Sequence, residues 1–443
     1  MLNPLRGFPV NLTRLLYSLV LYLGAPLALC YLLLRGVKNR AYRQRIPERF
    51  GCIRAAASTA PVIWVHAVSV GEVQAAATLV RRLLGAYPHY RVLLTTVTPT
   101  GAARVEALFA GAVEHRYLPY DLPHAVRLFL RRVKPRLLVI LETEIWPNLL
   151  YHCHHRGIPA ILVNARLSAA SLRSYLRCRR LSAPAVRWLG HIAARGEQDA
   201  ARFVALGADP VRVSITGDLK FDMAMQDAAT VSASSLRRTV AGTRPVWIAA
   251  STHAGEEEPV LDAFDRVRGT VADCLLVLAP RHPERFDRVY DRCRRRGLEV
   301  VRRTDAARST PEDTDVYLLD TLGELSRFYI CADVAFIGGS LVPAGGHNVL
   351  EAAALGVPLV SGEHTANFTE IIELFKAEQA LTIVTDAAQL AAAVTRLLQD
   401  KQLRQTCGLR GQRLVQQHQG ATDAVMALLE RYLDHGRRHG RCD

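Results

Sequence analysis

Short, mostly apolar runs recur along the chain, and most of them are followed by glycine, proline or a polar residue. Runs without polar alternation are typical of strands that are buried on both faces of a parallel sheet. The predicted strands are residues 62–65, 92–96, 137–141, 161–163, 245–250, 275–279, 315–319, 334–337 and 358–360. Helical periodicity is found at residues 73–84, 388–398 and 424–433. This alternation predicts an α/β fold with largely parallel sheets and right-handed crossovers.

The stretch of residues 334–360 combines several signals in one strand, glycine-rich loop, short helix and second strand. Gly345 and Gly346 allow the backbone to approach a ligand closely, and Asn348 with Glu351 forms a predicted capping box at the helix start. Bare N–H groups and the positive helix end would then favour a bound phosphate. Neither the dinucleotide-binding nor the P-loop fingerprint is present, and the same glycines could serve only as turns.

Carboxylates follow two of the predicted strands in the first half of the chain. Glu72 ends the loop after residues 62–65, and Glu142 and Glu144 follow residues 137–141. Open α/β sheets bind their ligands beyond the carboxyl ends of the strands, so we expect these side chains to line a crevice. Alternate residues after a strand can point either way, and the pattern does not choose between Glu142 and Glu144.

Charged residues take comparable positions in the second half. Lys220 lies in a predicted turn after a short strand, and Arg281 comes just after another strand, where a guanidinium can form a bidentate contact with phosphate. Gly323 and Glu324 open a predicted helix. Residues 256–258, all glutamates, are interpreted as the acidic first turn of a helix.

The length of the chain predicts two domains. A chain of 443 residues is too long for one ordinary core, and two α/β domains of about 200 residues each are expected. Residues 226–243 are rich in Ser, Ala and Thr without an apolar period, which indicates an interdomain linker. We predict a membrane anchor with a basic flank at residues 1–40 and two Rossmann-like domains at residues 41–228 and 229–425. Residues 426–443 would form a helix end with a basic tail.

The chain is strongly basic. It has 56 Lys and Arg against 41 Asp and Glu, a net charge of +15 and a pI of about 9.7. An anionic membrane, an anionic substrate or nucleic acid would each fit this charge, although no recognisable nucleic-acid module is present. Arginines are concentrated between Arg166 and Arg187, with Tyr175 and Trp188 among them. Such a segment either contacts acidic headgroups or is a solvated helix face.

Cysteine usage indicates reduced thiols. The nine cysteines are odd in number, scattered and without a C-x-x-C pair. This pattern argues against a disulfide framework and against a zinc knuckle.

Residues 15–34 form an uncharged apolar segment between Arg14 and Arg35. Twenty residues are just long enough to cross a hydrocarbon core of about 30 Å. Gly24 and Pro26 interrupt the segment, so a kinked helix within one leaflet is the alternative. Six basic residues follow between Arg35 and Arg49, and this bias predicts that the rest of the chain lies on the cytoplasmic side.

Seven motifs of the chain, taken in order, resemble those of one enzyme family. They include Ser-Val-Gly-Glu at residues 69–72 and Gly-Gly-His-Asn-Val-Leu-Glu at residues 345–351, and they lie within residues 64–72, 142–148, 164–168, 217–220, 250–253, 279–286 and 338–351. The chain is similar in these motifs to the 3-deoxy-D-manno-octulosonic acid (Kdo) transferases, GT-B glycosyltransferases of the inner membrane of Gram-negative bacteria.

The resemblance implies a fold and a reaction. The fold would be of GT-B type, with two Rossmann-like domains facing a central cleft. The reaction would move Kdo from CMP-Kdo to a lipid A precursor, lipid IVA, in lipopolysaccharide core biosynthesis, without a metal or another cofactor. The first domain would bind the lipid acceptor and the second CMP-Kdo, at the cytoplasmic side of the inner membrane.

The resemblance also implies roles for single residues. Glu72 would be the general base. In the transition state, Glu142 would lie near the positive charge on the sugar and Lys220 near the negative charge of the phosphate or the Kdo carboxylate. The residues that match the CMP-binding segments of the family are Pro280, Arg281, Leu322, Gly323, Glu324, Asn348, Val349, Leu350 and Glu351.

Two other classes of function remain. One is a different nucleotide-sugar enzyme on the same scaffold, such as a glycosyltransferase with a UDP donor or a nucleotide-sugar epimerase. The other is a membrane-anchored binder of acidic ligands that is not an enzyme, which the net charge of +15 would suit. The binder would not need Glu72, so a functional Glu72→Gln protein would favour it.

Overall fold

The structure is a computed structural model that describes residues 12–54, 58–229, 233–305 and 310–439. Its contacts divide the chain into two compact units, one formed by Met1–Leu219 with Gly420–Asp443 and the other by Lys220–Gln419. Each unit contains a seven-stranded sheet in which all pairings are parallel. The predicted α/β fold class is therefore confirmed, and each unit is described here by itself.

The first sheet has the strand order β3-β2-β1-β4-β5-β6-β7. Its strands are β1 (Val62–His66), β2 (Arg91–Thr96), β3 (Glu114–Tyr117), β4 (Pro135–Leu141), β5 (Ala160–Ala165), β6 (His191–Ala194) and β7 (Val213–Ile215). Successive side chains of a strand point to opposite faces, and both faces of β1 are buried. Ile63 and Val65 enter one apolar cluster and Trp64 the other, where its ring lies 4.8 Å from that of Phe129.

Helices cover both faces of this sheet. The helices of this unit are α1 (Leu12–Lys38), which contacts α6 and α8, and α2 (Val70–Ala75), α3 (Ala77–Ala86), α4 (Pro99–Phe109), α5 (Pro123–Val133), α6 (Pro147–His154), α7 (Ala169–Arg177), α8 (Arg179–Arg187), α9 (Glu197–Leu206) and α19 (Ala421–His439), with 3-10 turns at Arg40–Arg43, Ile46–Phe50 and Pro210–Arg212. The predicted helix at residues 73–84 is two helices that meet at Ala76.

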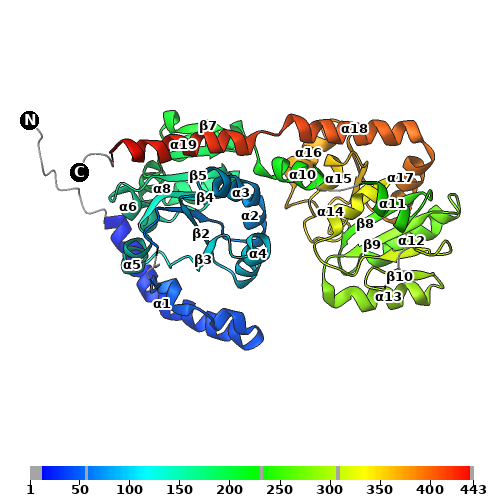
Figure 1. Ribbon diagram of the computed structural model, residues 1–443, viewed down its shortest axis with the longest axis horizontal. Coiled ribbons are helices and arrows are strands. Elements are labelled where there is room, and N and C mark those ends of the chain that lie inside the picture. Colours follow the sequence, from blue (N-terminus) through cyan, green and yellow to red (C-terminus); the bar gives the residue numbers. More distant parts are fainter. Residues whose placement is uncertain (1–11, 55–57, 230–232, 306–309, 440–443) are drawn as a thin grey trace, which may run out of the picture. The chain divides into compact units, whose positions relative to one another are not determined.

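The last helix of the chain belongs to the first unit, which the sequence did not indicate. In Figure 1, α19 runs along the first unit, and it contacts α3 and β4. Val425 and Leu429 of α19 are fully buried in the same apolar cluster as Leu83 of α3. The predicted boundary at residues 425 and 426 differs from this arrangement, because it assigned the start of α19 to the second domain.

The second sheet has the strand order β10-β11-β9-β8-β12-β13-β14. Its strands are β8 (Val246–Thr252), β9 (Leu275–Pro280), β10 (Val300–Arg302), β11 (Val316–Leu318), β12 (Val334–Ile337), β13 (Leu359–Ser361) and β14 (Leu381–Ile383). Here too the two faces of one strand enter different clusters, with Ile248 in one and Trp247 in the other.

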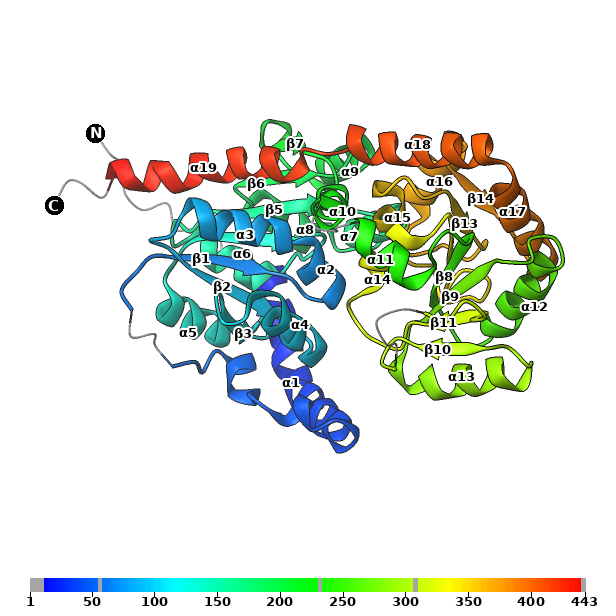
Figure 2. The ribbon, with the colours of Figure 1, turned by 45° about the vertical axis from the view of Figure 1, so that its right-hand side comes forward.

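Helices also lie on both sides of the second sheet (Figure 2). They are α10 (Leu219–Ala229), α11 (Ala233–Val240), α12 (Glu257–Arg268), α13 (Phe286–Arg295), α14 (Leu325–Phe328), α15 (Leu350–Ala354), α16 (Thr369–Ala377), α17 (Ala387–Gln399) and α18 (Lys401–Gln417), with 3-10 turns at Pro283–Arg285 and Tyr329–Cys331. The expected linker at residues 226–243 contains all of α11, and Val240 is buried in the core of the second unit. An irregular linker at this place was therefore the wrong interpretation.

Helix α1 carries the predicted apolar segment. It is continuous from Leu12 to Lys38, and Pro26 lies inside it. It is long and apolar enough to cross a membrane, with a mean hydropathy of 1.9 in its most apolar window. Its composition is compatible with an anchor.

Candidate active site

The strand order of the first sheet reverses between β1 and β4, which lie side by side. The loops that leave the carboxyl ends of two such strands diverge to opposite faces, and the crevice between them is the usual ligand site of an open α/β sheet. Glu72 follows β1, and Glu142 and Glu144 follow β4. The fold thus brings the carboxylates predicted in the first half of the chain to one place.

The carboxylate of Glu72 is held in place by the loop that precedes it. Ser69 caps α2, and its hydroxyl accepts a hydrogen bond from the Glu72 N–H at 3.3 Å. In return, the Val68 N–H donates to Glu72 Oε2 at 2.8 Å and the Ser69 hydroxyl donates to Oε1 at 3.1 Å. This reciprocal arrangement resembles a capping box, with the N–H of the residue before the cap in place of the N–H of the cap itself. It fixes the direction of the Glu72 side chain at the start of α2.

Burial raises the pKa of Glu72 to about 7, although the Val68 N–H acts in the opposite direction. The negative charges of Glu142 and Glu144 raise this pKa further. A carboxylate at the start of a helix ordinarily has a low pKa. Here desolvation wins, so near neutral pH Glu72 can both exist as a base and accept a proton.

Glu142 and Glu144 differ in their partners. Trp146 donates its indole N–H to Glu144 Oε2 at 2.7 Å. The Glu142 carboxylate forms no hydrogen bond to any side chain or N–H group among the described residues. Its backbone has φ of 57°, a left-handed conformation that is costly for a non-glycine residue and is often found at functional sites. Asn164, at the neighbouring β5, has φ of 51°. Hydrogen bonding and backbone conformation thus distinguish Glu142 from Glu144, which the sequence pattern could not do.

The second sheet has its own reversal of strand order, between β8 and β12. The loop after β8 carries His253 and Glu256, and the loop after β12 contains Gly339 and His347. Arg281 follows β9, the other neighbour of β8, and its N–H donates to the Thr252 carbonyl at 2.9 Å. The glycine-rich stretch and Arg281 therefore lie at the same end of the second sheet.

Glu256 organises the loop after β12. Its side chain is fully buried. It accepts hydrogen bonds from the N–H groups of Gly339 at 2.6 Å, Ser340 at 2.9 Å and Leu341 at 2.8 Å, and a fourth from His253 at 2.8 Å. The sequence did not reveal this role, because an acidic residue at a helix start is already explained by its favourable interaction with the helix dipole. The only available signal was the distant Gly338-Gly339-Ser340 run.

Glycine is required where this loop passes β8. A Cβ at Gly338 would lie 2.8 Å from the Ser251 carbonyl oxygen, and Gly339 has φ of 67°. Beyond these glycines, His347 Nε2 lies 2.8 Å from His253 Nε2. The loop is therefore tied to the end of β8 by a carboxylate and by an imidazole pair.

Positive charges surround the imidazole pair. Burial, then His253, Arg281 and His282, lower the pKa of His347 to about 4. Burial also lowers the pKa of His253, although Glu256 acts against it. The guanidinium of Arg281 is exposed and forms no ion pair within the described chain. This arrangement, neutral imidazoles beside an unpaired arginine, suits an anionic group such as phosphate.

The predicted capping box at Asn348 differs in detail. Helix α15 begins at Leu350 and has only five residues, so its dipole is small. Asn348 Oδ1 accepts the Leu350 N–H at 3.2 Å, and its Nδ2 donates to Glu351 at 3.1 Å. Among the described residues, no acceptor faces the N–H groups of His347, Asn348 and Val349. These amides, more than the helix end, are available to an anion.

The remaining predicted residues have other surroundings. Glu324 accepts two hydrogen bonds of 3.1 Å from Arg303, which holds its pKa low. Leu322 is 63% exposed, and Gly323 has φ of 85°. Lys220 lies in the first turn of α10 and not in a turn before it, with its Nζ 5.3 Å from the ring centroid of Phe368.

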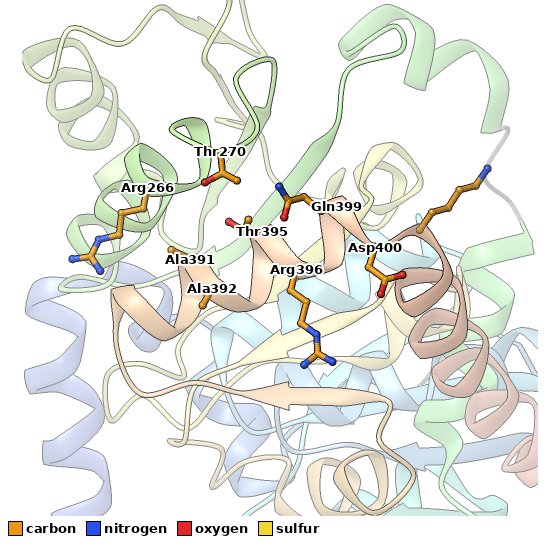
Figure 3. Close-up of a pocket in the computed structure, with 9 residues that line it drawn as sticks. Arg266, Thr270, Ala391, Ala392, Thr395, Arg396, Gln399 and Asp400 are labelled. Atoms are coloured by element: carbon orange, nitrogen blue, oxygen red, sulfur yellow. The ribbon is translucent and has the colours of Figure 1, made fainter.

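A surface hollow of 760 Å³ lies elsewhere on the second unit, between α12 and α17. In Figure 3, Arg266 and Arg396 extend in different directions from its wall. It shares no residue with the loops described above. Among the described residues, no cluster of three or more histidine, cysteine or acidic side chains could hold a metal ion.

Two family models match the chain. The model described as 3-Deoxy-D-manno-octulosonic-acid transferase (kdotransferase) matches residues 44–223. The model described as Glycosyl transferases group 1 matches residues 260–414.

Curated relatives extend the match to nearly the whole chain. The 3-deoxy-D-manno-octulosonic acid transferase of Haemophilus influenzae is 40% identical over 95% of this chain and 99% of its own length. That of Bordetella pertussis is 37% identical over 87% of this chain and 91% of its own.

Solved structures agree in fold. UDP-GlcNAc 2-epimerase from Neisseria meningitidis aligns with a TM-score of 0.57 and 13% identity, over 84% of this chain and all of its own. MurG from Acinetobacter baumannii aligns with a TM-score of 0.52 and 12% identity, over 84% of this chain and 99% of its own. At such identities only the fold is comparable.

Proposed function

The chain belongs to the family of 3-deoxy-D-manno-octulosonic acid transferases, and on that premise we propose that it transfers Kdo from CMP-Kdo to a lipid A precursor with inversion. That the protein is a glycosyltransferase follows from its family. The donor, the acceptor, the stereochemistry and the roles of single residues are our proposal.

One observation carries the mechanism, namely a carboxylate with a pKa of about 7 at the strand reversal of the first sheet. In the proposed step, a hydroxyl oxygen of the acceptor attacks the anomeric carbon of Kdo, and Glu72 takes the hydroxyl proton. The bond between this carbon and the phosphate oxygen breaks, and its electron pair leaves with CMP. A positioned base of matched pKa contributes about 10²–10⁴ to the rate of such a step.

The second unit would bind the cytidylate. The guanidinium of Arg281, which has no ion pair in the described part of the chain, supports binding of the phosphate. The open N–H groups of residues 347–349 can donate to the same kind of anion. Glu351 would bind the ribose, and the backbone of residues 322–324 would line the nucleotide. Positive groups that already face the phosphate stabilise the negative charge that develops on it as CMP leaves.

Two further residues would complete the charge distribution. Glu142, whose carboxylate has no hydrogen-bond partner among the described residues, would stabilise the positive charge that builds up on the sugar. Lys220 would oppose the negative charge of the Kdo carboxylate or phosphate. We propose that the protein's own groups provide this stabilisation without a metal ion.

The acceptor would come from a membrane. The apolar helix α1 supports attachment to a bilayer, and the basic surface suits acidic headgroups. Inner-membrane attachment, with the catalytic units in the cytoplasm, agrees with the excess of basic residues after Arg35.

The decisive experiment is to incubate the full chain with CMP-Kdo and a lipid A precursor and to weigh the lipid products. We expect a mass increase of one or more Kdo residues and release of CMP. A protein that binds UDP and not CMP by calorimetry, and yields no product, would instead be another nucleotide-sugar enzyme of this fold.

A further inference from the structure

Helix α1 is attached to the first unit by a buried polar network at its amino-terminal end. Arg14 donates to Asn148 Oδ1 at 2.9 Å, and Ser18 lies within 3.2 Å of the same atom. Tyr17 donates to Asp121 at 3.1 Å, and Asp121 in turn accepts the N–H groups of Asn148 and the next residue at the start of α6. Arg14 and Ser18 are buried. These turns of α1 therefore belong to the protein interior and not to a lipid phase.

The other end of α1 returns to the same unit. Arg43 donates to the Leu33 carbonyl, and Arg45 donates to the His115 carbonyl of β3 at 2.7 Å. Arg49 is buried and donates to the Val97 carbonyl at 2.9 Å. The segment that follows α1 is thus tied to the same unit as the first turns of the helix, which favours a helix that lies in one leaflet over a helix that spans the bilayer. Its exposed leucines instead suit the surface layer of one leaflet.

A groove of 1050 Å³ lies between α1 and the α7–α8 pair. Its apolar wall includes Leu16 and Val20 of α1, which are 53% and 65% exposed, and Leu176. The arginines of the groove are Arg177, Arg179, Arg180 and Arg187. It thus combines an apolar wall with a basic rim.

The basic rim of the groove contains arginines whose charge is not neutralised by an ion pair with any described residue. Arg177, Arg179 and Arg180 are exposed, and none of them forms an ion pair with any residue that the structure describes. Three unpaired guanidinium groups beside exposed leucine and valine fit one kind of molecule, an acylated lipid with an acidic headgroup such as a phosphate. A solvated helix face, the alternative from sequence, would not need the apolar wall of α1.

The groove is connected to the carboxylates at the strand reversal through Tyr175. Tyr175 of α7 packs against the same apolar cluster as Trp146, whose indole binds Glu144. Burial and the charge of Glu144 raise the pKa of Tyr175, and Tyr175 in turn adds to the raised pKa of Tyr17 in the groove. Tyr175 is thus close enough to interact electrostatically with Glu144 on one side and with Tyr17 of the groove on the other.

We propose that this groove is the binding site for the acyl and acidic portions of the lipid acceptor. The acidic group would contact Arg177, Arg179 and Arg180, and an acyl chain would lie along Leu16 and Val20. The sugar hydroxyl of the same molecule would then be directed toward Glu72. The inference rests on the proposed transferase function, and it names the place where that function takes its acceptor.

The test compares two triple variants of the full chain with equal loss of charge. One is Arg177→Gln with Arg179→Gln and Arg180→Gln. The control is Arg81→Gln with Arg131→Gln and Arg132→Gln, three exposed arginines on α3 and α5 of the same unit. Acceptor is supplied in neutral detergent micelles, so that no bilayer contributes. We expect the KM for acceptor to rise at least tenfold in the groove variant only, with the KM for CMP-Kdo within twofold in both.

A second pair of changes addresses the apolar wall. Leu16→Ser with Val20→Ser should also raise the KM for acceptor, without loss of folding because both side chains are exposed. An unchanged acceptor KM in the groove variants would overturn the proposal. The proposal would also be overturned if the groove variants bound anionic phospholipid vesicles more weakly than wild type but bound the acceptor lipid equally well. The groove would then be a general membrane contact.

Failure of the proposed function would look different. If the wild-type protein made no product, direct binding of the acceptor lipid in micelles would still test the groove. Weaker binding by the groove variant than by the control would support it, and equal binding would overturn it.

Discussion

His253 and His347 share one hydrogen bond, with their Nε2 atoms 2.8 Å apart and their rings stacked at 5.0 Å. Two imidazole nitrogens can be bridged by only one proton, so one ring donates and the other accepts. The pair connects the loops after β8 and β12, and burial, together with the positive charge of Arg281, keeps it from gaining a positive charge.

This pair predicts proton uptake when CMP binds. A phosphate beside Arg281 should raise the pKa of His347 from about 4 toward neutrality. CMP binding should then take up protons, and affinity should increase as the pH falls from 8 to 6. Calorimetry in buffers of different ionisation enthalpy measures this uptake. His347→Gln should reduce it relative to His418→Gln, and equal uptake in both variants would contradict the prediction.

Glu72 predicts the pH dependence of transfer. Only its ionised form is a base, so kcat should fall as the pH decreases below about 7, the raised pKa of this residue, and reach a plateau above it. Glu72→Gln should lower kcat by about 10²–10⁴ while CMP affinity stays within twofold.

Glu144 provides a matched change beside this base. Glu144→Gln removes a negative charge that raises the pKa of Glu72, so the pH profile should shift toward lower pH. A profile that stays in place would show that another group is titrating.

Glu256 and Glu257 form a natural pair of variant and control, because both are fully buried and adjacent. Glu256 binds N–H groups of the glycine loop, whereas Glu257 pairs with Arg285. Changing either one to Gln should cost about 2 kcal/mol of stability, since a charged acceptor is lost. Only Glu256→Gln should also weaken CMP binding, by about tenfold or more by calorimetry. Equal CMP affinity in both proteins would contradict the proposed role of the loop.

Asn148 predicts how firmly α1 is attached. Asn148→Ala removes the side chain that joins Arg14, Ser18 and the Asp121 carbonyl, and should lower the free energy of unfolding by about 2 kcal/mol. Trypsin should then cleave after Arg35 faster than in wild type. Gln402→Ala, at an exposed position of α18, is the control. Unchanged cleavage would show that the network does not hold the helix.

His66 predicts a loss of stability in acid. Its ring is fully buried, with Nδ1 bonded to Thr95 and no partner for Nε2 among the described residues, and burial lowers its pKa to about 4. The unfolded chain binds this proton near pH 6.5, so stability is full above that pH and falls by about 3 kcal/mol as the pH approaches 4.

The free energy of unfolding, measured by urea denaturation between pH 7.5 and 5, gives the number of protons taken up on unfolding. The pH dependence of stability should be smaller by up to one proton in His66→Asn than in wild type. The same slope in both proteins would mean that His66 does not contribute.

The apolar pattern predicted those parts of the fold that are buried on both sides. Central strands such as β4 and β9 are continuous apolar runs, and the prediction found them. The edge strand β3, Glu-His-Arg-Tyr, was missed because an edge needs less apolar cover. The place of α19 was also missed, since amphipathic periodicity gives the apolar face of a helix but not the sheet on which it packs.

The candidate site shows the same division. Residues next to strand ends, such as Glu72 and Arg281, could be found because topology places all such ends together. Glu256 could not, because its partners lie more than eighty residues away and are backbone groups. The raised pKa of Glu72 also escaped the sequence, which suggested the low value of a helix start; burial decides it.

The position of α19 has a consequence during synthesis on the ribosome. All residues of the second unit, Lys220–Gln419, emerge before the helix that covers part of the first sheet. We therefore expect the second unit to fold while the first still has an uncovered apolar face, a nascent state to which a chaperone can bind until α19 has emerged.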